Sequence, residues 1–366
     1  MYIFATCFAL LFLFWNSKQK RKYNQVGVIF VVLILFIGGF RDATIGTDIA
    51  IHDDGYYMLW KNPFNYPRNL ETGFVFLTAL IKWIFPSYYF YYSVIYILTI
   101  LLFCYASKKL GINHILFLAM ILIGGLLGPC FNVIRQMLAL SIGLSVYALF
   151  WSNDLHSDFI KRVAKYEVAI IVAGFLFHQS LFLLTIVPFL GIRKIFDFLN
   201  KDLVLFSLLG GALFLIIAGS DYINLALFFL EGRISGRAEF WANTYAQAGD
   251  TVEATHGYMT TLLNGIIAIL LSRNNRDVYF MTGFLGLLLS GICASSLGTI
   301  GRAFDNLTVF LLLFWAKYWF QLYKSFKLHP ISYGLQLSRI VLWISSLYFT
   351  LFTNESLNPY KTFIGL

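Results

Sequence analysis

The chain has 366 residues, of which 59% are hydrophobic and 12% are charged, whereas a soluble domain carries about 25% charged residues. This composition excludes a soluble enzyme or binding module. The formal charge of +9 does not indicate nucleic-acid binding, because Lys and Arg lie in short connectors between apolar segments. The sequence therefore predicts an all-α integral membrane protein.

Apolar segments recur at lengths that suit the hydrocarbon core, which an α-helix crosses in about 17–25 residues. The first, Met1–Asn16, is unlike a signal peptide, because its positive charge follows the apolar run and no small-residue cleavage site is present. We interpret it as a retained span. The clearest later spans are Leu203–Gly219, Tyr258–Leu271, Val278–Leu297 and Phe304–Phe320. Counting along the chain predicts a polytopic bundle of roughly ten spans (nine to eleven) in a single membrane domain, 1–366.

Two apolar segments do not fit a simple count. Phe74–Phe85 is too short to cross comfortably, so it predicts a half-span or an interfacial helix. Glu167–Ile192 is interrupted at His178 and has basic residues on both sides. It is either a pair of half-helices that meet at the histidine or one full crossing that breaks the charge rule. A broken helix at membrane depth needs surrounding protein or a water-filled cavity.

Basic residues are divided unevenly between the two sides of the predicted bundle. Eighteen of the 27 lie in six connectors: Lys18–Lys22, Lys108–Lys109, Lys161–Lys165, Arg193–Lys201, Arg273–Arg276 and Lys317–Arg339. Since cytoplasmic loops carry the excess of Lys and Arg, we expect these connectors inside and both termini outside. Two long polar segments, about residues 41–72 and 220–257, then lie outside. Their aromatic and charged residues suit either sugars and phosphates or lipid headgroups.

Arg135 is the strongest candidate for an anion site, since an arginine within a span costs about 2.5–3.5 kcal/mol at the bilayer centre. A Gly-Pro break precedes it, so we expect a helix to begin at about Phe131. The N–H groups and positive dipole end of this helix would face the exterior. Arg135 would lie one turn in, beside Asn132 and Gln136, in an arrangement that suits a phosphate oxygen. The alternative is an arginine that reaches the outer headgroups.

Further arginines follow the same pattern on the outer side. Arg302 opens a span with Asp305 three residues later, so it is either an anion site or half of a local ion pair. Arg41 ends the second span, and Arg233 and Arg237 lie four residues apart in the second outer segment. Each is either solvated near headgroups or part of a site. Together with Arg135 they predict an outward cationic pocket that suits a pyrophosphate.

Acid–base candidates lie in the outer segments and at His178. His178 is either a hydrogen-bonded core residue or a functional residue at a helix break. The outer groups that can accept a hydroxyl proton are His52, His256, Asp48, Asp53, Asp54, Glu71, Asp250 and Glu253. No Walker loop, GxGxxG, HExxH or CxxC motif is present, so ATP, dinucleotide and zinc chemistry are unsupported. We expect no cofactor, and the involvement of a divalent metal ion stays an open question.

Several of these residues form an ordered pattern along the chain. In order, they are Arg41, Gly46-Thr47-Asp48, Tyr56-Tyr57, Glu71, Asn132, Arg135-Gln136, Phe177-His178, Arg302 and Pro359-Tyr360. This ordered set resembles the EpsG family of bacterial polysaccharide polymerases, which is related in role to the Wzy O-antigen polymerases. The chain departs from the family in having Ile49 where many members carry a tyrosine, and the loop with Arg233 and Arg237 matches no family motif.

The resemblance implies polymerisation on the outer face of a bacterial plasma membrane. The substrate would be an oligosaccharide repeat unit linked through pyrophosphate to undecaprenol, and the growing chain would be the donor. The expected pyrophosphate and sugar ligands are Arg41, Asn132, Arg135, Gln136, Arg233, Arg237 and Arg302. Asp48, Glu71 or His178 would orient or deprotonate the acceptor hydroxyl. Membrane lipid, a chain-length regulator and a flippase are the candidate partners. An O-antigen-type ligase and a lipid-linked oligosaccharide flippase are the rival functions.

Overall fold

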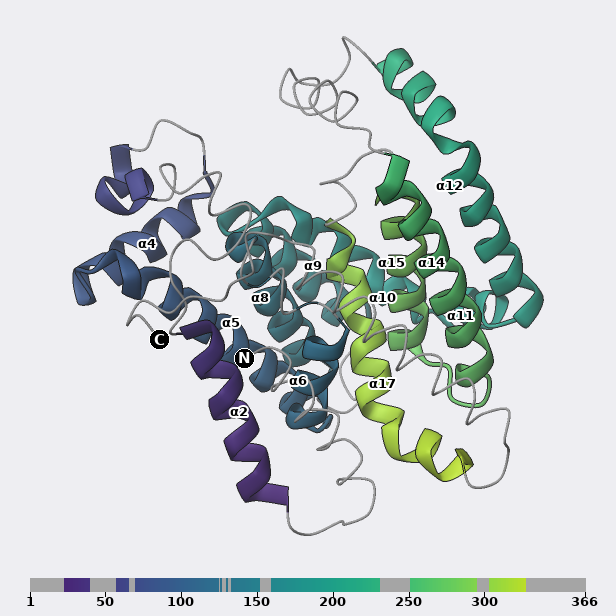
Figure 1. The fold of residues 1–366 in the computed structure, drawn as a ribbon, viewed down its shortest axis with the longest axis horizontal. Coiled ribbons are helices and arrows are strands. Elements are labelled where there is room, and N and C mark those ends of the chain that lie inside the picture. Colours follow the sequence, from purple (N-terminus) through teal and green to yellow (C-terminus); the bar gives the residue numbers. More distant parts are fainter. Residues whose placement is uncertain are drawn as a thin grey trace. The chain divides into compact units, whose positions relative to one another are not determined.

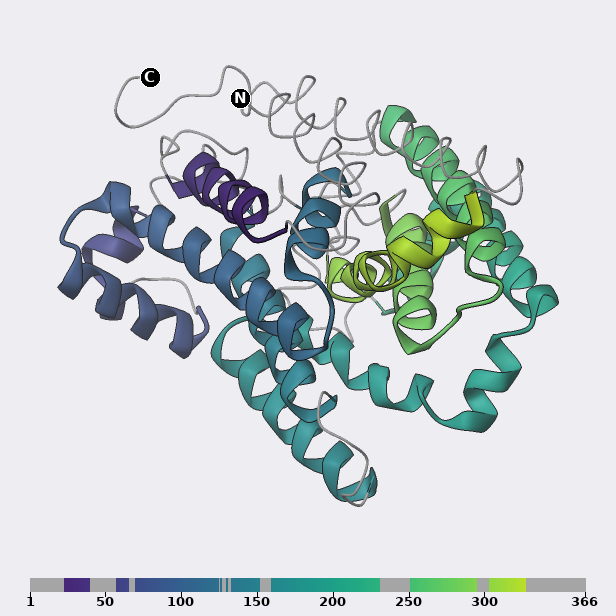
Figure 2. The same cartoon turned by 90° about the horizontal axis from the view of Figure 1, so that it is seen from below.

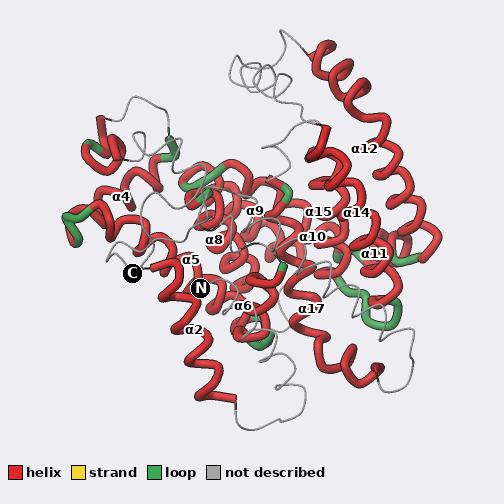
Figure 3. Tube along the Cα trace, viewed as in Figure 1, coloured by secondary structure: helices red, strands yellow, loops and turns green. Residues whose placement is uncertain are grey.

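The structure is a computed structural model that describes residues 23–39, 57–65, 70–124, 126, 130, 133–151, 159–230, 251–294 and 303–326. Within these ranges every regular element is a helix and no strand occurs (Figure 3). The all-α prediction is therefore confirmed for this part of the chain. The chain divides into two compact units, and the first comprises residues up to Thr185 together with two later segments.

The first unit contains most of the candidate site residues that the structure describes. Its elements are α2 (Tyr23–Gly39), η1 (Pro63–Asn65), α4 (Thr72–Ile84), α5 (Tyr88–Lys109), α6 (His114–Ile123), α8 (Ile134–Trp151), α9 (Phe159–Leu176) and the 3₁₀ helix η2 (Gln179–Ile186). α5 lies along α8 (Figures 1 and 2). The Ser145 hydroxyl of α8 donates to the Leu102 carbonyl of α5 at 3.3 Å, which links the two helices within the apolar interior.

Polar side chains of α5 also fix its neighbours. The Tyr96 hydroxyl donates to the Ile34 carbonyl of α2 at 2.8 Å, and Ser93 donates to the Gly39 carbonyl. Gly38 lies directly against the Tyr96 ring, where a Cβ atom would collide with it. A turn at Gly111, with a φ of +71°, leads into α6. The Asn113 side chain caps α6 by accepting from the Ile115 and Leu116 amides, as an N-cap asparagine does.

The segment after α9 folds back on itself instead of continuing as one straight helix. The Tyr166 hydroxyl of α9 donates to the Leu184 carbonyl of η2 at 2.9 Å, and Gly174 lies against the Phe182 ring. The chain therefore reverses direction around His178. Of the two interpretations left open by the sequence, two helical limbs that meet at the histidine agree with this geometry. The basic residues on both sides of the segment favour the same arrangement.

α4 is a 13-residue helix with two different apolar faces. Phe74, Thr78 and Ile81 are buried, whereas Phe76 and Trp83 are 66% and 82% exposed. At 1.5 Å per residue the helix is about 20 Å long, which is shorter than the ~30 Å hydrocarbon core. These dimensions agree with the expectation of a half-span or an interfacial helix.

The second unit comprises Ile186–Phe314 and a later segment. Its elements are α10 (Val187–Leu190), α11 (Arg193–Leu199), α12 (Asp202–Leu230), α14 (Thr251–Ser272), α15 (Val278–Ala294) and the first part of α17 (Asp305–Phe326). The Arg276 side chain is only 3% exposed. It donates to the Asn200 and Ile269 carbonyls and pairs with Asp202 at 2.5 Å, so it holds the start of α12 to the end of α14.

Each of the four clearest predicted spans overlaps a described helix, namely α12, α14, α15 or α17. In the described part of the chain, Phe90–Lys109 and Ile134–Trp151 are long and apolar enough to cross a membrane. A third crossing is added if Arg193–Leu199 and Asp202–Ile217, which meet at an angle of 71°, form one bent span. The total of about ten spans stays a prediction, as does the placement of both termini outside.

Candidate functional site

Arg135 lies in the first turn of α8, closer to the helix end than the sequence led us to expect. Val133 is in a bend, and α8 begins at Ile134. The predicted start at about Phe131 is therefore wrong, and Arg135 is the second residue of the helix. The first backbone bond of α8 runs from the Met137 amide to the Val133 carbonyl at 3.0 Å. A cation at this end opposes the helix dipole, so Arg135 needs a nearby negative group.

Glu71 supplies that group. Its Oε2 atom accepts a hydrogen bond from Arg135 Nη1 at 2.7 Å, and the two side chains are 15% and 23% exposed. Glu71 is also the N-cap residue of α4, yet its side chain makes no capping hydrogen bond. The carboxylate that would ordinarily satisfy the first amides of α4 is directed to α8 instead. This ion pair joins the beginnings of two helices that are 64 residues apart in sequence.

The end of α9 also lies beside this ion pair, because α4 begins directly against it. A Cβ atom on Gly73 would lie 2.6 Å from the Leu176 carbonyl oxygen and 2.9 Å from Leu176 Cβ. Real Cβ atoms essentially never approach backbone this closely. Only glycine therefore allows this contact, which brings Glu71 beside the turn that follows α9.

His178 lies in that turn. Its Nδ1 atom is 2.8 Å from the Ser180 hydroxyl and accepts the Ser180 amide at 3.2 Å, so the ring caps the start of η2. Gly73, which contacts Leu176 two residues before His178, lies two residues after Glu71, the partner of Arg135. The chain therefore brings the three side chains to the same region. We call the meeting point of α4, α8 and the α9–η2 turn, marked by Glu71, Arg135 and His178, the helix-end junction.

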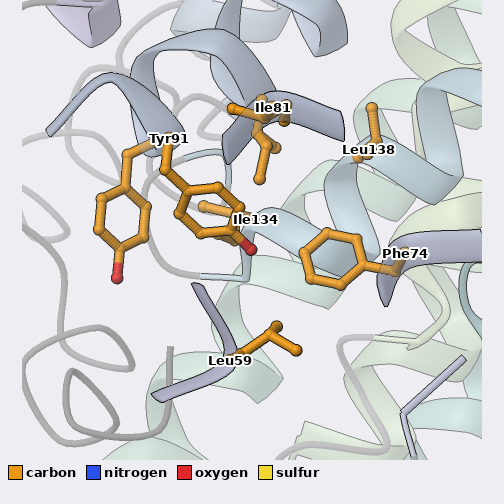
Figure 4. Packing of buried hydrophobic residues seen from close by; sticks show 8 residues of the cluster. Leu59, Phe74, Ile81, Tyr91, Ile134 and Leu138 are labelled. Carbon is orange, nitrogen blue, oxygen red and sulfur yellow. The ribbon is translucent and has the colours of Figure 1, made fainter. Parts of the chain in front are cut away.

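An apolar cluster supports the junction from within the first unit. Phe74 of α4 and Ile134 and Leu138 of α8 pack with Tyr91 of α5 and with Leu59 (Figure 4). Phe74 lies three residues after Glu71 and Ile134 directly precedes Arg135. Both side chains are at most 1% exposed. Because this interior is closely packed, the side chains of the junction are held on rigid helix ends.

The structure brings three of the ten predicted site residues together, namely Glu71, Arg135 and His178. Gln136 is buried, 7% exposed, in the first turn of α8. The remaining predicted residues, Arg41, Asp48, Asn132, Arg233, Arg237 and Arg302, lie outside the described residues. The convergence of Arg41, Arg135 and Arg302 in one cationic pocket stays a prediction.

Sequence reasoning missed two features of this region. It named Glu71 and Arg135 separately, as a base and an anion ligand, because no local signal indicates a pair so distant in sequence. It also missed an aromatic group formed by Tyr57, Trp60 and Tyr88, with ring centroids 5.3–5.9 Å apart. The Lys82 ammonium group lies 5.3 Å from the Trp60 ring. Aromatic and cationic side chains of this kind can bind a sugar face or the membrane interface.

The chemistry available at the helix-end junction is that of a charged pair and an imidazole. A guanidinium binds phosphate oxygens, a carboxylate accepts protons, and an imidazole donates or accepts one hydrogen bond at each nitrogen. Among the described residues, no three or more His, Cys, Asp or Glu side chains are placed to hold a metal ion.

Comparison with known proteins identifies one relationship. No curated protein and no solved structure matches the chain. The model of the EpsG family matches residues 24–362, which is nearly the whole chain and includes the helix-end junction. The resemblance drawn from the ordered motifs is therefore confirmed, and the chain belongs to the EpsG family of polysaccharide polymerase-like membrane proteins.

Proposed function

We propose that this protein polymerises oligosaccharide repeat units that are linked through pyrophosphate to undecaprenol, on the outer face of a bacterial plasma membrane. The observation that carries the proposal is the helix-end junction. There, a partly buried guanidinium and carboxylate form an ion pair beside the turn that holds an imidazole, over an apolar cluster. Membership of the EpsG family supports a polymerase-type role.

The reaction requires one bond to form and one to break. The acceptor hydroxyl oxygen of a new repeat unit attacks the anomeric carbon of the growing chain. The bond between that carbon and the pyrophosphate oxygen breaks, and undecaprenyl pyrophosphate leaves as an anion. The hydroxyl proton passes to a carboxylate. Because negative charge develops on the leaving oxygen, fixed cationic and N–H donors accelerate this step.

The junction residues divide these tasks. Arg135 binds the pyrophosphate, since Glu71 engages only one of the N–H groups of its guanidinium among the described residues. Glu71 orients Arg135 through Oε2, and it or Asp48 accepts the proton from the acceptor hydroxyl. His178 orients the substrate. Arg41, Asn132, Arg302 and the loop residues Arg233 and Arg237 provide further contacts to pyrophosphate or sugar.

The test is a glycan ladder from a deletion strain complemented with wild-type or variant genes. The Arg135→Ala variant should abolish the polymer, leave single repeat units on the final acceptor, and accumulate to wild-type levels. Arg135→Lys is the matched control that keeps the charge and loses the planar fork, and we expect it to restore only a fraction of the polymer. Full-length polymer in the Arg135→Ala strain would refute the assignment of this arginine.

The deletion strain also separates the rival functions. Loss of a polymerase leaves one repeat unit attached to the acceptor, because the units still reach the exterior. Loss of an O-antigen-type ligase leaves no unit attached. Loss of a flippase also leaves none, and the lipid-linked unit accumulates on the inner leaflet. A deletion strain without single attached units therefore contradicts the proposal.

A further inference from the structure

The α9–η2 turn fixes where the proton of His178 resides. A backbone amide is always a hydrogen-bond donor, so the Ser180 amide requires a lone pair on His178 Nδ1, 3.2 Å away. The Ser180 hydroxyl, 2.8 Å from the same nitrogen, can serve as a second donor to it. A ring that accepts at Nδ1 is neutral and carries its proton on Nε2. This tautomer presents a donor, and no acceptor, away from the turn.

The Nε2 atom of the ring is not fully enclosed by the described residues. Within the described residues Nε2 has no hydrogen-bond partner, and it is not among the buried polar atoms that lack one. Since His178 as a residue is only partly exposed, the nitrogen is accessible in an otherwise enclosed position. Arg135 belongs to the same junction, because its partner Glu71 lies at the start of α4, which contacts the end of α9. A donor beside a cation selects an anionic oxygen.

We infer that His178 binds an oxygen of the substrate pyrophosphate through its Nε2–H group, and that the backbone amide of Ser180 positions the ring by fixing this tautomer. The inference rests on the proposed function and assigns one of its contacts. It separates His178 from the proton-accepting groups, because an imidazole whose Nδ1 caps η2 and whose Nε2 carries hydrogen has no lone pair for the acceptor hydroxyl. Proton transfer is then left to a carboxylate.

Two amide substitutions test the roles of the two ring nitrogens of His178 one at a time. In His178→Asn the side-chain amide replaces Nδ1, so its oxygen can still cap η2, but nothing donates at the Nε2 position. In His178→Gln the longer side chain brings an N–H donor near the position of Nε2 and loses the cap. A role confined to capping η2 favours Asn, whereas a role in binding pyrophosphate favours Gln.

The direct readout is binding of undecaprenyl pyrophosphate to the purified full chain in detergent, with undecaprenol as the control lipid that lacks phosphate. We expect His178→Asn to weaken binding of undecaprenyl pyrophosphate about tenfold or more, which is the scale of one hydrogen bond to a charged group. His178→Gln should retain the larger share of both binding and polymer length. Binding of undecaprenol should be the same for all three proteins.

Several results would overturn the inference. In the first, His178→Asn makes wild-type polymer and binds undecaprenyl pyrophosphate with wild-type affinity, while His178→Gln is inactive. In the second, both variants are inactive although their affinity for undecaprenyl pyrophosphate is unchanged. If both substitutions reduce the yield of folded protein, the tautomer of His178 in the unmodified chain decides the matter, read from the ¹⁵N NMR shifts of its imidazole. A ring that carries its proton on Nδ1, where the Ser180 amide requires a lone pair, would exclude the inference. A deletion strain that still makes polymer refutes the proposed function itself, whatever the histidine variants do.

Discussion

Gly73 offers the sharpest test of whether the geometry of the helix-end junction matters, because it bears no functional group. In Gly73→Ala the new Cβ would lie 2.6 Å from the Leu176 carbonyl oxygen, whereas ordinary contacts begin at 3.4 Å. The start of α4 must therefore move by 3.4 minus 2.6, or about 0.8 Å. If Glu71, two residues away, moves with it, its 2.7 Å contact with Arg135 lengthens to about 3.5 Å, the outer limit of a hydrogen bond.

The expected consequence is larger for activity than for stability. Inserting one methyl group into a packed contact destabilises a fold by about 1–3 kcal/mol, whereas a misplacement near 1 Å in an active site can reduce the rate about one hundredfold. We expect Gly73→Ala to accumulate in the membrane and to give a ladder that is severely shortened. The assays are the glycan ladder and immunoblotting of membrane fractions from the complemented deletion strain.

Gly210→Ala is the matched control, because a Cβ atom at Gly210 meets nothing within 4 Å. In a helix interior this change is neutral or stabilises by up to about 1 kcal/mol, so polymer length should be unchanged. A Gly73→Ala strain with wild-type abundance and a wild-type ladder would refute the reasoning. The exact placement of Glu71 relative to Arg135 and the α9–η2 turn would then be irrelevant to function.

Two further predictions concern stability and the membrane. Arg276→Ala removes a guanidinium that is 3% exposed and leaves Asp202 without its closest partner, so we expect a loss of about 3–5 kcal/mol and a lower melting temperature of the purified protein. Arg273→Ala, at a side chain that is 73% exposed, should change stability by less than about 1 kcal/mol. If the two substitutions lower stability equally, the buried pair of Arg276 with Asp202 does not stabilise the fold as expected. A spin label at Trp83→Cys, on the exposed face of α4, should be more accessible to oxygen than to a water-soluble nickel chelate. The reverse order would mean that this face lies in water instead of lipid.

Features of the fold that depend on local composition could be predicted from the sequence. The apolar segments at Leu203–Gly219 and Val278–Leu297 coincide with helices because burial in an apolar medium requires internally satisfied backbone groups. The break at His178 was also visible, since a polar triplet interrupts an otherwise apolar run. The basic residues on both sides favoured a fold-back but left a full crossing open, and the contact between Tyr166 and Leu184 agrees with the fold-back.

The candidate site could be predicted only residue by residue. Arg135, Glu71 and His178 were recognised from charge in an apolar setting and from their order along the chain. The approach of the Glu71–Arg135 pair to the turn with His178 depends on Gly73, whose missing side chain allows α4 to approach Leu176. A glycine gives no signal of close approach in a single sequence, since some glycines here, such as Gly210, face open space. The start of α8 at Ile134 was also missed, because a Gly-Pro break limits where a helix can begin without fixing its first residue.

Arg135 and Glu71 each occupy a position at which their side chain does not stabilise its own helix. Arg135 at the start of α8 opposes the helix dipole, which costs about 0.3–1 kcal/mol, and Glu71 forgoes a capping bond worth about 1 kcal/mol. The charged hydrogen bond between them contributes about 1.5–3 kcal/mol, which roughly offsets both losses. The arrangement therefore brings little net stability. Its consequence is a guanidinium and a carboxylate held at fixed positions on rigid helix ends, which a site that binds pyrophosphate and accepts a proton requires.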